Sequence, residues 1–111
     1  MTPELALAQL ADLAPEVREG VVLGPGGERL AGSPALAGPA RELFRRTEAG
    51  QAEIVTPRGA VFAQRDGRHA IAVVTARSAL PAVMHSDLRM TLAALAGGHG
   101  NGAGAGDGGR A

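Results

Sequence analysis

The chain has 111 residues, of which 45% are hydrophobic, and its 11 basic residues balance 11 acidic ones. This length predicts one domain, and the balanced charge argues against nucleic acid and membrane as partners, because both attract positive charge. The chain has no Cys, which excludes disulfides, thiolate metal sites and Cys nucleophiles. Its start carries Glu4 where a secretory signal would be basic, and no apolar run reaches membrane-spanning length. We therefore expect a cytoplasmic protein.

The N-terminal segment predicts a helix followed by two strands. The helix is expected to begin at Thr2, which can cap it, and to end before Pro15. Its apolar positions recur on one face: Leu7, Leu10, Ala11 and Ala14. Residues 21–23 and 28–31 then predict short strands, joined by the glycine-rich turn 24–27.

A second helix is predicted after the break at Gly32, becoming regular near Pro39 and extending to Gly50. Its sheet-facing residues have helical spacing: Leu36, Ala40, Leu43, Phe44 and Thr47. The opposite face then carries the charged residues Arg41, Glu42, Arg45, Arg46 and Glu48. This helix is therefore expected to be amphipathic, with a charged outer surface.

Three antiparallel strands are predicted next, at residues 51–56, 60–64 and 69–76, with Asp66-Gly67 forming the second turn. The last strand is apolar without alternation, as expected for a central strand covered on both faces. The strand 51–56 mixes polar and apolar residues and is expected at an edge.

The closing helix is predicted to begin after Ser78, to accept Pro81 in its first turn and to end at Gly97. One face carries Met84, Leu88, Thr91, Leu92 and Leu95. Residues 1–96 would then form the domain. Residues 97–111, rich in Gly and Ala, are expected to form a disordered tail because they cannot bury enough apolar surface.

This succession of elements resembles the roadblock and dynein light chain family in its bacterial type. The resemblance is carried by residues 15–23 and 27–31, which lead from the first helix through the first hairpin, and by residues 60–63, 71–74 and 87–95. It implies an α/β fold of the α+β type. The five-stranded antiparallel sheet would have the order 2-1-5-4-3, with the first and third helices on one face and the second on the other.

The resemblance also implies a homodimer, joined through the second helix and third strand, that serves as a platform for small Ras-like GTPases or larger assemblies. The candidate interface residues are Arg41, Glu42, Arg45, Arg46, Glu48, Glu53, Ile54 and Val55. Exposed strand edges recruit further strands. A charged helix is unusual at an interface core, and a two-fold arrangement would allow Glu42 to meet Arg45 or Arg46 of a second copy.

Other chemistries find less support in the sequence. Glycines 24–27 are followed by a strand, whereas a phosphate cradle leads into a helix N-terminus, so a plain turn is favoured. His69, His85 and His99 have no second ligand at helical spacing, which argues against a metal site. Neighbouring residues on a helix point about 100° apart, so Ser86 beside His85 forms no catalytic relay.

The sequence therefore predicts a non-catalytic scaffold or regulator, not an enzyme, that uses no cofactor and binds a second copy of itself and a small GTPase. The alternative is a small-molecule sensory module of the PAS or GAF kind, which also places helices around an antiparallel sheet. Only Phe44 and Phe62 are available as aromatic lining for its pocket.

Overall fold

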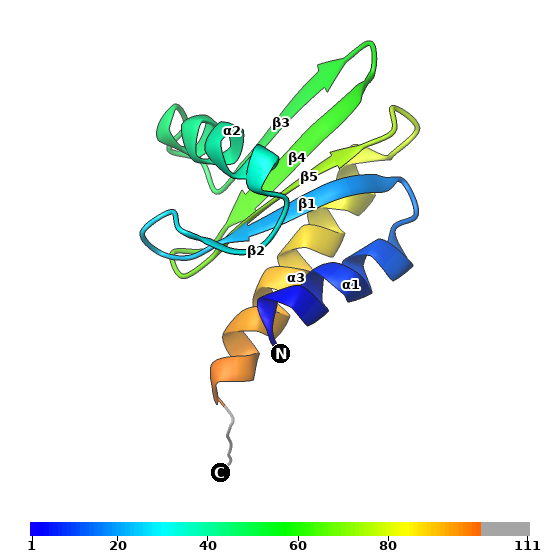
Figure 1. Cartoon of the computed structure of the whole chain (residues 1–111). Coiled ribbons are helices and arrows are strands. Elements are labelled where there is room, and N and C mark those ends of the chain that lie inside the picture. Colours follow the sequence, from blue (N-terminus) through cyan, green and yellow to red (C-terminus); the bar gives the residue numbers. More distant parts are fainter. Residues whose placement is uncertain (101–111) are drawn as a thin grey trace.

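Helices cover both faces of a five-stranded antiparallel sheet (Figure 1). The computed structural model describes residues 1–100, with side chains to residue 97. In chain order the elements are α1 (Pro3–Leu13), β1 (Val17–Leu23), β2 (Arg29–Gly32), α2 (Pro34–Arg45), β3 (Gln51–Thr56), β4 (Gly59–Arg65), β5 (Ala70–Thr75) and α3 (Pro81–Gly100). This is the predicted succession of helices and strands.

The strands lie in the order β2-β1-β5-β4-β3, which confirms the predicted sheet. β5 is the central strand, and its residues Ile71, Ala72 and Val73 are buried. Burial of consecutive residues requires cover on both faces, because successive side chains of a strand point to opposite sides. β3 lies at the edge, also as predicted.

The two faces of the sheet have separate cores, which confirms the predicted placement of the helices. On the side of α1 and α3, Leu10 and Leu88 pack with Phe62 and Val73 of the sheet. On the side of α2, a smaller cluster is formed by residues of that helix and of the strands. It comprises Val21, Leu23, Leu36, Ala37, Ala40, Phe44, Ala63 and Ala72.

α1 begins as predicted, because the Thr2 hydroxyl accepts a hydrogen bond of 3.1 Å from the Leu5 amide. Its buried face differs from the predicted one. Ala6 and Leu10 are buried, whereas Ala11 is exposed. Ala6 and Leu10 are one helical turn apart and so face the core together, while Ala11 is turned about 100° away from Leu10.

α2 begins at Pro34 and ends at Arg45, so the predicted start near Pro39 and end at Gly50 were wrong. Proline suits a first helical turn, and packing of α2 on the sheet outweighs the one backbone bond that Pro39 removes. The end is fixed from outside the helix. Arg65 donates hydrogen bonds of 3.1 and 2.7 Å to the carbonyl oxygens of Phe44 and Thr47.

β1 and α3 each differ from prediction at one boundary. β1 begins at Val17, earlier than residue 21, because its first half pairs with β5 as far as Thr75. α3 continues past Gly97 to Gly100. Residues 101–111 lie outside the described residues, so the tail stays a prediction. No helix in the described part of the chain has both the length and the hydropathy needed to cross a bilayer.

Candidate interaction surface

One side of β3 is open. The strand pairs with β4 along its whole length, from Gln51 opposite Gln64 to Thr56 opposite Gly59, and its other side faces away from the sheet. Ile54 and Val55 are 46% and 60% exposed, so both apolar side chains are accessible at this edge. An open strand edge presents unpaired N–H and C=O groups to another chain. The predicted edge residues are therefore placed at an accessible edge.

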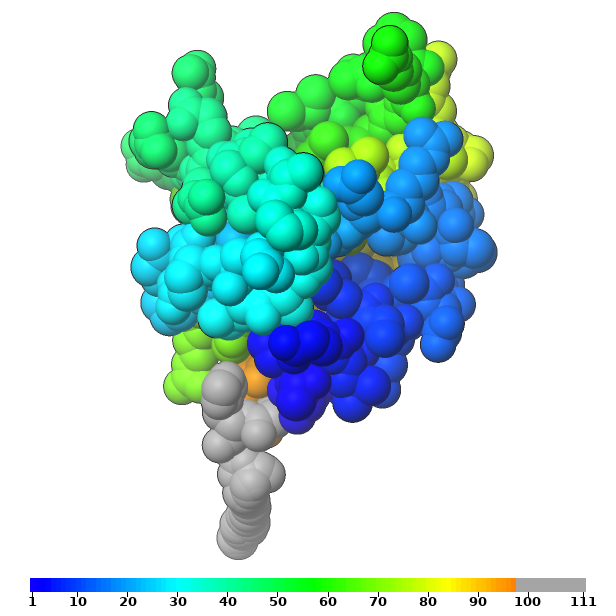
Figure 2. Space-filling model, viewed as in Figure 1, coloured from blue at the N-terminus to red at the C-terminus, as the bar shows by residue number. Residues whose placement is uncertain are grey.

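An apolar row crosses the sheet beside α2. Ile54 is opposite Val61, and Val61 is opposite Val74, so the three side chains share one face. That face is the α2 side, because Val74 packs against the smaller core cluster. Figure 2 shows an open notch between the C-terminal part of α2 and the β3–β4 hairpin. We call Ile54, Val61 and Val74 the apolar row.

The charged residues predicted for the outer face of the second helix do not form one surface. Glu42 binds Arg45 at 3.0 Å and Arg46 at 2.8 Å within the same chain. Arg41 instead donates a hydrogen bond of 2.9 Å to the carbonyl of Gly27. Glu48 lies beyond the end of the helix and is exposed. The exposed ion pairs contribute little stability, so Glu42 and its arginines remain able to exchange partners.

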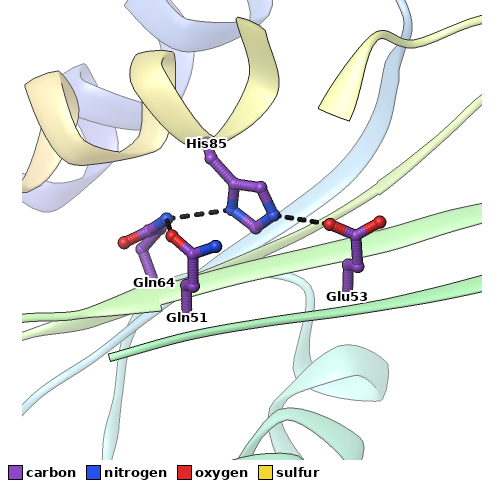
Figure 3. Close-up of polar contacts among 4 residues, drawn as sticks. All are labelled: Gln51, Glu53, Gln64 and His85. Carbon is purple, nitrogen blue, oxygen red and sulfur yellow. Dashed lines mark hydrogen bonds and ion pairs between the residues drawn. The ribbon is translucent and has the colours of Figure 1, made fainter. Parts of the chain in front are cut away.

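A partly buried polar network joins the edge strand to α3 (Figure 3). Gln64 Nε2 lies 3.1 Å from Gln51 Oε1 and 2.9 Å from His85 Nδ1, while His85 Nε2 lies 3.0 Å from Glu53 Oε1. Because an amide nitrogen only donates, His85 Nδ1 accepts and Nε2 carries the ring proton to Glu53. The imidazole is 5% exposed, with its ring perpendicular to Phe62.

Sequence reasoning missed this network. Glu53 and His85 are 32 residues apart, and only the fold brings them together. One feature of the sequence pointed to it: Gln64 and His85 are polar residues at positions that the predicted elements would bury. A buried polar group needs a hydrogen-bond partner, so each of them should have one. The network also separates the roles of two candidate residues. Glu53 faces α3, whereas its neighbour Ile54 faces α2.

The backbone amides of the glycine-rich turn are hydrogen-bonded within the turn and to Glu28. The Gly26 amide donates to the Glu28 carboxylate at 2.9 Å, and the Gly24 amide donates to the Glu28 carbonyl at 2.8 Å. The Gly27 amide donates to the Gly24 carbonyl at 3.0 Å. β2 follows directly, so residues 24–27 form a turn between two strands, as predicted.

His69 and His85 belong to different elements of the fold. His69 precedes β5 and is buried, His85 belongs to the network with Glu53, and the side chain of His99 lies outside the described residues. Among the residues that the structure describes, no three His, Cys, Asp or Glu side chains come close enough together to bind a metal ion.

Comparisons with known proteins show a likeness in structure and not in sequence. No family model matches the chain, and no curated protein matches it. A Roadblock/LC7 domain from Streptomyces avermitilis superposes with a TM-score of 0.68 at 23% identity, over 81% of this chain and 94% of that one. The gliding protein MglB from Thermus thermophilus gives a TM-score of 0.59 at 16% identity, over 82% of this chain and 85% of that one.

A third similar structure comes from a complex of LokiProfilin2 with rabbit actin. Its TM-score is 0.66 at 11% identity, over 81% of this chain and 92% of that one. At these identities the likeness concerns the fold. The order of elements, the 2-1-5-4-3 sheet and the superposition agree with the resemblance seen in the sequence. The chain has the Roadblock/LC7 fold.

Proposed function

We propose that this chain is a non-catalytic scaffold or regulator that works as a homodimer and binds a small Ras-like GTPase. The observation that carries the proposal is the open edge of β3 beside the apolar row. The likeness to the Roadblock/LC7 and MglB structures supports it. A profilin from an actin complex has a similar fold, so the fold alone does not indicate the partner. The partner has to be inferred from the residues on the surface.

The edge of β3 fits a second copy of the same strand. Two antiparallel copies of Gln51–Thr56 related by a two-fold axis would continue one sheet across both chains. Such an interface is self-complementary, because the same patch meets itself. Pairing would satisfy the outward backbone groups of both strands.

The apolar row supplies the hydrophobic part of the interface. Ile54 is 46% exposed, while Val61 and Val74 are half-buried, as is Leu43 on α2. When the two β3 strands pair, α2 of the second copy approaches this notch and can cover it. Burial of apolar surface stabilises the dimer by about 25 cal/mol for each Å² removed from water.

The charged residues of α2 would lie at the rim. Glu42 is bound to Arg45 and Arg46 in one chain, and the same three residues can pair across a two-fold axis without leaving a charge unpaired. Arg41, Glu48, Glu53 and Val55 complete the proposed interface. Rim charges of this kind influence specificity and association rate more than affinity.

Light scattering at micromolar concentration tests the dimer. The wild-type chain should have twice the mass of one 11.1 kDa chain. Ile54→Glu should be monomeric, because it places a charge in the apolar row. Val83→Glu is the matched control, since Val83 is 51% exposed on α3, and it should stay dimeric. A monomeric wild type, or equal effects of the two variants, would contradict the proposal.

A separate experiment tests the GTPase step. The tagged wild-type chain and Ile54→Glu are used as baits in cells of the native host, and each small GTPase recovered is purified and tested again alone. The expected result is a GTPase that binds the wild-type dimer directly and Ile54→Glu at least tenfold more weakly. Recovery of no small GTPase would refute the GTPase partner while leaving the dimer intact.

A further inference from the structure

A hollow of about 680 Å³ lies at one end of the sheet, next to the C-terminal half of α2. Three segments far apart in sequence form most of it: the β1–β2 turn 24–27, residues 41–45 of α2, and residues 65–70, which comprise the β4–β5 turn and the strand residue on either side (Figure 1). Gly50, just before β3, also lines it. No residue of the apolar row lines it. Its volume lies in the range of about 300–1,000 Å³ that small-molecule sites occupy.

Four arginines line the hollow, namely Arg41, Arg45, Arg65 and Arg68. No carboxylate is among the lining residues of the described chain. The chain as a whole has balanced charge, so this local excess arises because the fold gathers cations from α2 and the β4–β5 turn. A concave surface lined by charges of one sign concentrates ions of the opposite sign.

The nearby carboxylates are already engaged. Glu28 accepts the Gly26 amide, and Glu42 binds Arg45 and Arg46. Asp66 accepts the amides of Arg68 and His69. These three acidic groups therefore hold the turns and the helix that surround the hollow.

Two of the four arginines are held in place. Arg65 donates to two carbonyl oxygens at the end of α2, and its guanidinium lies 5.1 Å from the ring centre of Phe44. Arg41 donates to the Gly27 carbonyl at 2.9 Å. A guanidinium has five N–H donors, so both retain donors for a ligand. Arg68 is exposed and able to move toward an anion, whereas Arg45 is exposed but paired with Glu42 at 3.0 Å.

The end of a helix usually repels anions, because its last carbonyl oxygens carry partial negative charge. Here Arg65 binds the carbonyl oxygens of Phe44 and Thr47, and the Arg46 amide binds those of Glu42 and Leu43. These contacts leave the C-terminus of α2 compatible with a nearby anion.

The hollow also has an apolar part at its floor, where Ala70 is half-buried and Leu23 and Phe44 are 2% and 7% exposed. A ligand that fits both parts has an anionic group and an apolar body. The planar fork of arginine matches phosphate with two parallel hydrogen bonds. We propose that the hollow binds a small organic phosphate, with its phosphate on the arginines and its apolar body on this floor.

Calorimetric titration of the full chain at constant ionic strength tests the site, with inorganic phosphate, adenosine monophosphate and adenosine as probes. Adenosine monophosphate should bind at least tenfold more tightly than either inorganic phosphate or adenosine, because only it contacts both parts. Equal binding of the two phosphates, or no binding of either at millimolar concentration, would overturn the proposal.

Single substitutions of the arginines test whether the ligand binds in the hollow. Arg68→Gln removes an exposed cation of the hollow and should weaken binding of adenosine monophosphate about tenfold, as expected for one charge-assisted contact. Arg41→Gln should do the same, and thermal melting verifies that each variant is folded. Arg89→Gln is the control, since it removes the same charge from an exposed position on α3.

The control should bind within twofold of the wild type. Equal weakening by Arg68→Gln and Arg89→Gln would show general charge attraction and overturn the site. A tetraglutamate peptide that binds more tightly than adenosine monophosphate would also overturn it, because the hollow would then be a surface for acidic peptides.

Discussion

His85 Nε2 lies 3.0 Å from Glu53 Oε1, so a helix that covers one face of the sheet is hydrogen-bonded to the edge strand β3. The contact directs Glu53 toward α3. Because side chains alternate along a strand, the next residue, Ile54, is directed toward α2. The network thus helps to place the apolar row where a second copy can reach it.

His85→Ala should lower the free energy of unfolding by about 2–4 kcal/mol, because it opens a cavity beside Phe62 and removes a buried partner of Gln64. Urea denaturation measures this change in the free energy of unfolding. Arg89→Ala, exposed on the same helix, should change it by less than about 0.5 kcal/mol. Similar stability of the two variants would show that the network does not hold β3 to α3.

Gly32 and Gly97 should respond in opposite ways to substitution by alanine. Gly32 has a φ of +95°, and a Cβ there would lie 2.8 Å from the Val21 Cα and against the Gly20 carbonyl. Gly32→Ala should therefore destabilise the fold by more than about 2 kcal/mol. Gly97 is inside α3 with open space around it, so Gly97→Ala should stabilise by about 0.5–1 kcal/mol.

Thermal melting of both glycine variants provides the comparison. A stabilised Gly32→Ala would contradict the close packing between β2 and β1. A destabilised Gly97→Ala would contradict the continuation of α3 through Gly97.

Asp66 makes the β4–β5 turn sensitive to acid. Partial burial raises the pKa of this carboxyl, but hydrogen bonds from the His69 and Arg68 amides lower it, and the net pKa lies below the usual 3.8. A lowered pKa favours the folded state while the group is ionised, so its contribution is present above pH 3.8 and lost as the pH falls through the folded value.

Asp66→Ala should therefore unfold more easily than the wild type at neutral pH, by about 1 kcal/mol for an exposed turn. Urea denaturation at neutral pH and at a pH below the folded pKa measures the difference. It should narrow at the lower pH, where the wild-type carboxyl is protonated. A difference of the same size at both pH values would contradict the role assigned to the ionised form.

The sheet was predictable where the apolar pattern was unambiguous. The unbroken apolar run from Ile71 to Val74 identified the central strand, and the mixed residues around Glu53 identified an edge. The limits of α2 were not predictable. Its end depends on Arg65, which is distant in sequence, and its start depends on packing that outweighs the local effect of Pro39.

The site was predictable only in part. Exposure of Ile54 and Val55 follows from an edge position, but the apolar row requires the register that sets Ile54 opposite Val61 and Val61 opposite Val74. Sequence periodicity gives the period of a strand and not its register with a neighbour. In the same way, the arginines of α2 and of the β4–β5 turn share one hollow only because the fold brings the two segments to the same end of the sheet.

Cysteine scanning of β3 tests the central claim most directly, because the natural chain has no Cys. Each residue of Gln51–Thr56 is replaced singly by Cys, and Val83→Cys on α3 is the control. Opposed residues of antiparallel strands have Cα atoms about 4.5–5.5 Å apart, a separation that a disulfide spans. Under mild oxidation we expect linked dimers at the one or two positions nearest the two-fold axis. If no β3 position links more than Val83→Cys, the β3-paired dimer is contradicted.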